Sequence, residues 1–86
     1  VNDYELKKEI KRKTNKLKNQ ISRSESRIEE LEQEIKRLDE IIVDLNYDDK
    51  VEAEKVLGNY NDLKKELDSS MKEWESATED FSELQD

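Results

Sequence analysis

The segment Asp44-Leu45-Asn46-Tyr47-Asp48-Asp49 interrupts a heptad pattern that otherwise runs along most of the chain, so it determines how the chain folds. Asn and Asp side chains hydrogen-bond to nearby backbone groups, so they favour turns and caps over helix interiors. Asp49-Lys50-Val51-Glu52 also fits a capping box, in which Asp49 accepts from the first amides of a new helix and Glu52 reaches back to the Asp49 amide. We therefore expect a turn over about residues 46–49 and a second helix that begins near Lys50.

Before the turn, apolar residues recur at alternating spacings of four and three, which is the pattern of a coiled coil. The series at the d positions is Ile10, Leu17, Ser24, Leu31, Leu38 and Leu45. The series at the a positions is Thr14, Ile21, Ile28, Ile35 and Ile42. The pattern predicts a first helix over about residues 4–45, with these side chains along one seam.

After the turn, the same pattern resumes out of phase and predicts a second helix over about residues 50–84. Its seam is Ala53, Val56, Tyr60, Leu63, Leu67, Ser70, Trp74, Ala77, Phe81 and Leu84. A phase shift of this kind fits either a bend between two helices or a stutter in one continuous helix that pairs with a second chain.

Charge patterning favours the bend. Folding at the turn sets three pairs of opposite charge side by side: Lys13–Asp80, Arg27–Glu66 and Glu32–Lys64. A parallel dimer instead sets two like-charged pairs together, Lys13 with Lys18 and Glu34 with Asp39, and has one favourable pair, Arg27–Glu32. Ile at a with Leu at d is typical of parallel dimers, so that arrangement stays the alternative. We predict an all-α fold, a single two-helix antiparallel coiled-coil hairpin over residues 1–86, with the isolated chain monomeric.

Composition argues against an enzyme. The chain is 47% charged and has no Cys or His, so zinc has neither thiolate nor imidazole ligands. The single glycine, Gly58, stands outside any phosphate-binding loop. Asp44, Asn46 and Asp48 copy the start of a calcium loop, but its required glycine is replaced by Asp49, and its twelfth position, normally Glu, is Lys55. We therefore predict no catalytic, cofactor-binding or metal site.

No apolar run approaches the roughly 18 residues that a membrane span needs. Val1 is not a natural start, so we expect the chain to be the C-terminal part of a longer protein. With no Cys and no secretory signal, we expect that protein to be cytoplasmic, without membrane contact.

Charge is distributed unevenly. Residues 1–27 contain nine Lys or Arg and four Asp or Glu, a net charge of +5. Residues 28–86 contain seven Lys or Arg and twenty Asp or Glu, a net charge of −13. A basic stripe on a helix can contact phosphates without reading bases. The candidate nucleic-acid-binding residues are Lys7, Lys8, Lys11, Arg12, Lys16, Arg23 and Arg27. The alternative interpretation is a solvated face that partly neutralises the acidic second helix.

Three aromatic residues, Tyr60, Trp74 and Phe81, have two interpretations. They could form a stacking platform for bases. Their positions on the seam favour a role in the core instead.

Two segments resemble a known family. The first is Arg27-Ile28-Glu29-Glu30-Leu31-Glu32-Gln33-Glu34-Ile35. The second is Tyr60-Asn61-Asp62-Leu63-Lys64-Lys65-Glu66-Leu67, followed by Met71-Lys72-Glu73-Trp74-Glu75. At this spacing they look like the C-terminal coiled-coil hairpin of ABC-F ATPases, which have two nucleotide-binding domains and no membrane part. The resemblance runs from about Tyr4 to Leu84.

The resemblance implies an accessory domain of an ATPase that acts on the translating ribosome. In some ABC-F proteins this hairpin binds DNA or contacts ribosomal RNA, so nucleic acid or the ribosome and the parent's own ATP-binding domains are the implied partners. ATP and Mg²⁺ would bind in those upstream domains and not in this hairpin. The alternative is a purely structural or protein-interaction arm of an unrelated protein.

Overall fold

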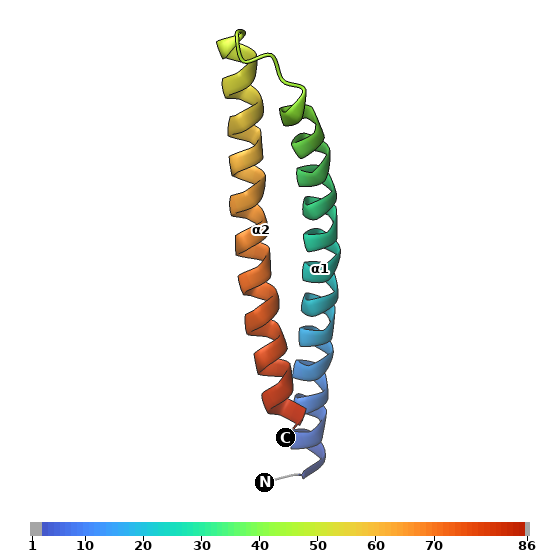
Figure 1. Ribbon diagram of the computed structural model, residues 1–86. Helices are drawn as coiled ribbons and strands as arrows, with labels where there is room; N and C mark the ends of the chain where they lie inside the picture. Colours follow the sequence, from blue (N-terminus) through green and yellow to red (C-terminus); the bar gives the residue numbers. More distant parts are fainter. Residues whose placement is uncertain (1–2, 86) are drawn as a thin grey trace.

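The computed structural model describes residues 3–85 and forms a helical hairpin about 70 Å long and 16 Å wide. Helix α1 spans Asp3–Val43 and helix α2 spans Lys50–Gln85. The two helices run antiparallel, so the first turns of α1 and the last turns of α2 lie at the same end (Figure 1). The predicted all-α antiparallel hairpin is confirmed, and the continuous-helix alternative is wrong.

The turn between the helices is built from Asx residues, as the sequence predicts. The Oδ1 atom of Asn46 accepts from the Asp48 amide at 3.0 Å. The Oδ1 atom of Asp49 accepts from the Glu52 amide at 3.2 Å, which makes Asp49 the N-cap of α2. The Asp49 amide donates to the Asn46 carbonyl at 3.2 Å, so it is already satisfied without the side chain of Glu52.

Helix α1 ends at Val43, two residues before the end predicted from the sequence. The amides of Asp44 and Leu45 donate to carbonyls only three residues back, those of Ile41 and Ile42, at 3.2 and 3.3 Å. Three-residue bonds of this kind tighten the last turn of a helix and prevent it from continuing. The Tyr47 hydroxyl adds a bond to the Ile42 carbonyl at 3.2 Å.

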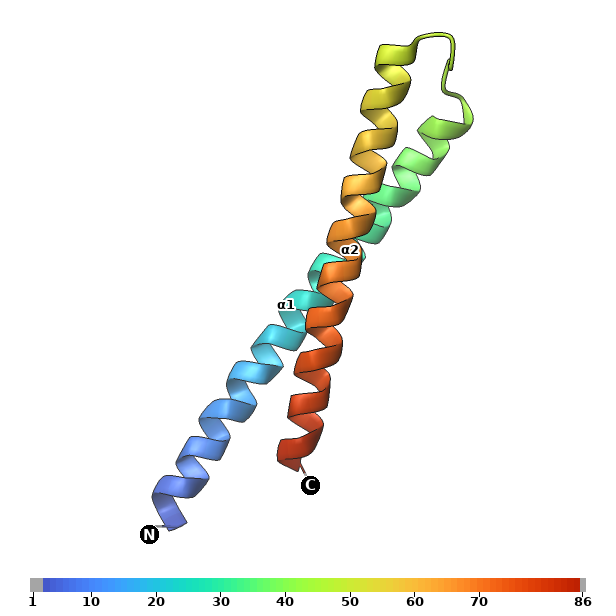
Figure 2. The same ribbon diagram turned by 90° about the vertical axis from the view of Figure 1, so that its left-hand side faces the viewer.

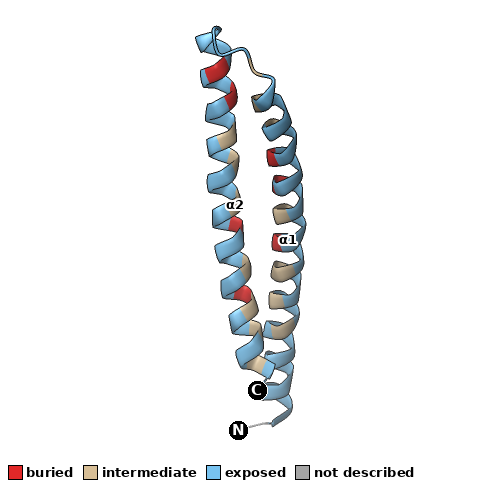
Figure 3. Cartoon of the chain, in the orientation of Figure 1, coloured by how far each residue is buried: buried red, intermediate tan, exposed pale blue. Residues whose placement is uncertain are grey.

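The buried residues all fall on the predicted seam. They are Ser24, Leu31 and Ile35 on α1, and Ala53, Val56, Ser70 and Ala77 on α2. The buried positions of each helix face the other helix (Figure 3). Because each helix hides only this stripe, burial of the seam is the main force that holds the hairpin closed.

One predicted seam residue, Ile10, is 41% exposed. Ile10 lies 17 residues before Arg27, and α2 ends at Gln85, 19 residues after the Arg27 partner Glu66, so Ile10 faces the last turn of α2. The N-terminal end of α1 extends beyond the end of α2 (Figure 2), which leaves fewer side chains to cover this layer. Leu31, three heptads later, is completely buried. The prediction that Ile10 packs in the seam is therefore wrong, because a regular heptad pattern in one helix does not reveal where the opposite helix ends.

Of the three charge pairs predicted across the hairpin, Arg27–Glu66 is confirmed, and it agrees with the predicted register of the helices. Lys13 instead forms an ion pair with Glu9 on its own helix, at 3.6 Å. Lys64 lies over the ring of Tyr60, with its Nζ atom 4.6 Å from the ring centroid. A hydrogen bond with the Tyr60 side chain raises the pKa of Lys64. Within residues 3–85 neither of these two predicted pairs forms an ion pair, although Lys13 and Asp80 line the same surface cavity.

Neither helix is long and apolar enough, within the described residues, to cross a membrane.

Candidate nucleic-acid interface

The first turns of α1 carry a cluster of basic side chains on one side of the helix. These residues line a shallow surface cavity of about 540 Å³, and we call them the basic face: Tyr4, Lys7, Lys8, Lys11, Arg12 and Asn15. Spacings of three and four place them on adjacent turns of one helix surface. All six are exposed, and no acidic residue lines the cavity.

Two members of the basic face were not identified from the sequence, Tyr4 and Asn15. Tyr4 is 72% exposed, so its ring is accessible beside the lysines. Its spacing of three and four residues before Lys7 and Lys8 is the signal that could have revealed it. An aromatic ring next to ammonium groups can stack on a base while the ammonium groups contact phosphates.

Lys16 and Arg23 lie elsewhere on α1. Lys16 lines a different surface cavity, shared with Asp80 and Glu83 of α2. Arg23 lines a third, shared with Glu73. The structure therefore separates these two candidates from the basic face and places them where acidic side chains of α2 weaken their attraction for a polyanion.

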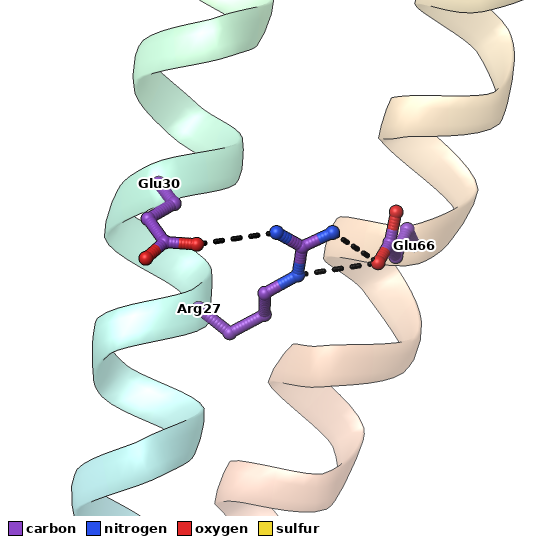
Figure 4. A network of polar contacts seen from close by, with 3 residues as sticks. All are labelled: Arg27, Glu30 and Glu66. Atoms are coloured by element: carbon purple, nitrogen blue, oxygen red, sulfur yellow. Dashed lines mark hydrogen bonds and ion pairs between the residues drawn. The ribbon is translucent and has the colours of Figure 1, made fainter.

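Arg27 is engaged in a polar network between the helices (Figure 4). Its guanidinium donates to Glu66 through both Nε, at 3.2 Å, and a terminal nitrogen. The other terminal nitrogen donates to Glu30 at 3.2 Å. The hydrogen bond to Glu66, followed by that to Glu30, raises the pKa of Arg27. The two carboxylates beside Arg27 compensate its charge, so it attracts phosphate less than the cations of the basic face do.

The aromatic side chains of the seam are packed between the helices. Tyr60, Trp74 and Phe81 are each partly buried, which supports the core interpretation over a stacking platform. The ring of Phe81 also lies under the ammonium of Lys18, at 5.9 Å. The indole nitrogen of Trp74 is buried without a hydrogen-bond partner among residues 3–85.

In the part of the chain that the structure describes, no group of three or more His, Cys, Asp or Glu residues could hold a metal ion. The Asx residues of the turn instead bond backbone amides, which supports their interpretation as a turn and not as a calcium loop.

Residues 5–79 match the family model described as ABC transporter C-terminal domain. The match covers most of both helices and the turn between them. It confirms the family resemblance seen in the sequence. No curated protein and no solved structure matches the chain.

Proposed function

The chain belongs to the ABC transporter C-terminal domain family, and we propose that it is the accessory C-terminal domain of an ABC-F ATPase that contacts nucleic acid through the basic face of α1. The ATP and Mg²⁺ of such a parent would bind in its upstream domains. The hairpin itself would supply contact and no catalytic group.

The observation that carries the proposal is the separation of charge along α1. The four cations of the basic face lie at the end of the hairpin opposite the turn, which we call the open end; α1 extends beyond α2 there, and no acidic residue lines their cavity. Lys and Arg side chains arranged in this way bind phosphate oxygens by charge and carry no base specificity. The surface therefore suits a DNA or RNA backbone.

The acidic remainder of the hairpin limits the contact to that end. With a net charge of −13 over residues 28–86, the bend and most of α2 repel a polyanion. A nucleic acid would therefore approach the open end and touch few phosphates. We expect weak, sequence-tolerant binding that depends strongly on salt.

Fluorescence anisotropy of a labelled DNA duplex, and separately of a structured RNA, tests the contact. With four phosphate contacts, log K should fall with log salt at a slope of about −3.6 for DNA, or roughly 100-fold between about 50 and 200 mM salt. The variant Lys7→Gln/Lys8→Gln/Lys11→Gln/Arg12→Gln should lose at least about 10-fold in affinity at low salt and most of that slope.

A matched control removes the same charge elsewhere. The four exposed bases Lys36, Arg37, Lys55 and Lys65 lie outside the basic face, and their replacement by Gln should change affinity less than about 3-fold. Equal losses in the two quadruple variants would show that net charge alone governs binding. No binding at low salt would refute the contact and leave the structural-arm alternative.

The parentage has a separate test in the coding sequence upstream of Val1. Two tandem domains, each with a Gly-x-x-x-x-Gly-Lys-Thr or Gly-x-x-x-x-Gly-Lys-Ser loop, are expected because such loops cradle nucleotide phosphates. Their absence would refute the ABC-F assignment without touching the result of the binding experiment.

A further inference from the structure

The two helices enclose an apolar groove of about 420 Å³ at mid-length. Its apolar lining residues are Ile28, Met71 and Trp74. Its other lining residues are glutamates, three on α1 and one on α2: Glu25, Glu29, Glu32 and Glu75. Met71 is 40% exposed, so apolar surface lies open between four carboxylates. A partner that fits this surface must bring both positive charge and carbon surface.

The basic face has both properties and lies on the same side of α1 as the groove. Tyr4, Lys7, Lys8 and Lys11 each stand 21 residues before a groove residue, in the order Glu25, Ile28, Glu29 and Glu32. Twenty-one residues are three heptads, so in a coiled coil both sets occupy the same heptad positions. The two surfaces therefore point in one direction, about 31 Å apart along the helix axis at 1.5 Å per residue.

Their spacings also complement each other when two α1 helices lie antiparallel. Opposing Lys7 to Glu29 on a second copy sets Lys11 opposite Glu25 in the same register. Tyr4 then lies opposite Glu32, and Lys8 opposite Ile28, with its aliphatic stem toward the apolar lining. In a two-fold arrangement each of these pairs occurs twice, because residue i of one copy meets residue j of the other, and residue j of the first copy meets residue i of the second.

We propose that the groove is occupied by a second copy of this chain, in a two-fold dimer in which each basic face lies on the acidic groove of the other copy. The dimer forms four ion pairs, from Lys7 to Glu29 and from Lys11 to Glu25, each in both directions. It also covers Met71 and Trp74 with the side chains of the opposing first turns.

The residues near the two-fold axis are compatible with this arrangement. The axis passes close to Lys18, midway between the two surfaces. Two lysines opposite each other would repel, but the Lys18 ammonium lies 5.9 Å from the Phe81 ring centroid, directed toward its own hairpin. The neighbouring outer residues Asn15, Asn19 and Ser22 are short and uncharged, so they allow the helices to approach.

The association should be weak and salt-sensitive. Each contact involves only a few side chains on one side of a helix, and interfaces below roughly 1,200 Å² are typical of weak complexes. Exposed ion pairs lose strength as salt screens them. The chain should therefore be monomeric in dilute solution, as expected from the sequence, and dimeric when concentrated at low salt. A nucleic acid bound to the basic face would compete with the second copy, but the dimer does not depend on that binding.

Sedimentation equilibrium of the 86-residue chain, without nucleic acid, tests the dimer. At about 50 mM salt we expect a dissociation constant between about 10 μM and 1 mM, and about 10-fold weaker association at about 500 mM salt. The emission of Trp74, the only tryptophan, should shift with concentration in parallel. A mass of 10.3 kDa at every concentration up to about 1 mM at low salt would overturn the proposal.

A charge swap tests the register. Lys7→Glu/Lys11→Glu and Glu25→Lys/Glu29→Lys should each weaken association at least about 10-fold, and the four substitutions together should restore it to within about 3-fold of the original. Lys55→Glu/Lys65→Glu, the control for net charge, should leave it within about 3-fold. Circular dichroism verifies that each variant is helical, since all these positions are exposed. Failure of the combined variant to restore association would overturn the pairing.

Discussion

The middle of the hairpin and the open end of α1 have the same heptad pattern but different surroundings. Leu31, in the middle, is fully buried, whereas Ile10, three heptads earlier, is 41% exposed. The difference arises because α2 ends at Gln85, and the N-terminal end of α1 extends beyond it (Figure 2). A heptad pattern therefore specifies which stripe of a helix is apolar, while the length of the opposite helix decides which layers of that stripe are buried. The middle stabilises the fold, and the open end stays accessible to partners.

The largest expected effect comes from a charge in the middle. Leu31→Asp places a carboxylate without a partner at a fully buried position and should cost several kcal/mol, on the order of the whole stability of a small hairpin. Thermal denaturation followed by circular dichroism measures it. Ile10→Asp, the matched substitution at the open end, should cost less than about 1 kcal/mol. Similar losses at both positions would contradict the difference between the two regions.

A smaller effect, of opposite sign, is expected at Gly58. This glycine lies on the exposed side of α2, and a Cβ atom built there meets nothing within 4 Å. Gly58→Ala should raise the free energy of unfolding by about 1 kcal/mol, because alanine is the better helix former. This gain would show that the exposed side of α2 can stabilise the hairpin without any change in the seam. Chemical denaturation measures it, and a loss of stability would show that the position is packed.

Arg27 lies where the basic segment meets the acidic one, and its removal should have a modest effect. Arg27→Gln breaks the bonds to Glu66 and Glu30 and should lower Tm by about 2–4 °C at low salt, with a smaller loss at high salt. The salt dependence distinguishes two causes of a lower Tm, because salt screens an exposed ion pair but does not change the loss of side-chain packing. A Tm decrease that does not change with salt would contradict this account.

The smallest effect concerns pH. The contact with Tyr60 raises the pKa of Lys64 above its ordinary value of 10.5. Because the pKa of Lys64 is raised in the folded state, its ammonium contributes to the free energy of unfolding. That contribution is complete below pH 10.5 and is lost as pH rises through the folded-state pKa. The difference in Tm between the original chain and Lys64→Met should therefore be constant near neutral pH and shrink above pH 10.5. A Tm difference between the two proteins that changes between pH 6 and 9 would contradict this assignment to the Lys64 ammonium.

The sequence predicted the helices, the turn and the register well, because each rests on local chemistry or strict periodicity. Asp49 caps α2 as its position before Lys50 indicates, and Arg27 meets Glu66 as heptad geometry requires. Lys13 lies by Asp80, as predicted, since both line one surface cavity, but it forms its ion pair with Glu9. Lys64 contacts the ring of Tyr60, and no ion pair with Glu32 forms within residues 3–85. Long lysine side chains reach several acceptors, so the heptad positions do not determine which one each lysine contacts.

The candidate site was predicted only as a set of residues and not as a surface. The charge count identified the basic segment, but it could not separate Lys7 and Lys11 from Lys16, which shares its cavity with Asp80. That separation depends on where α2 places its acids, which follows from the three-dimensional arrangement of the helices. The groove beside Trp74 escaped detection for the same reason, since both helices line it.

We propose that nucleic acid contacts the open end of α1, whereas the middle of the hairpin holds the fold. Mapping of NMR chemical-shift changes on titration with a short DNA duplex, in dilute protein at low salt, separates these two roles. We expect changes at Lys7, Lys8, Lys11 and Arg12 and their neighbours, with Leu31 and Ile35 unaffected. Changes concentrated on α2 or at the turn, or no changes at low salt, would contradict this proposal.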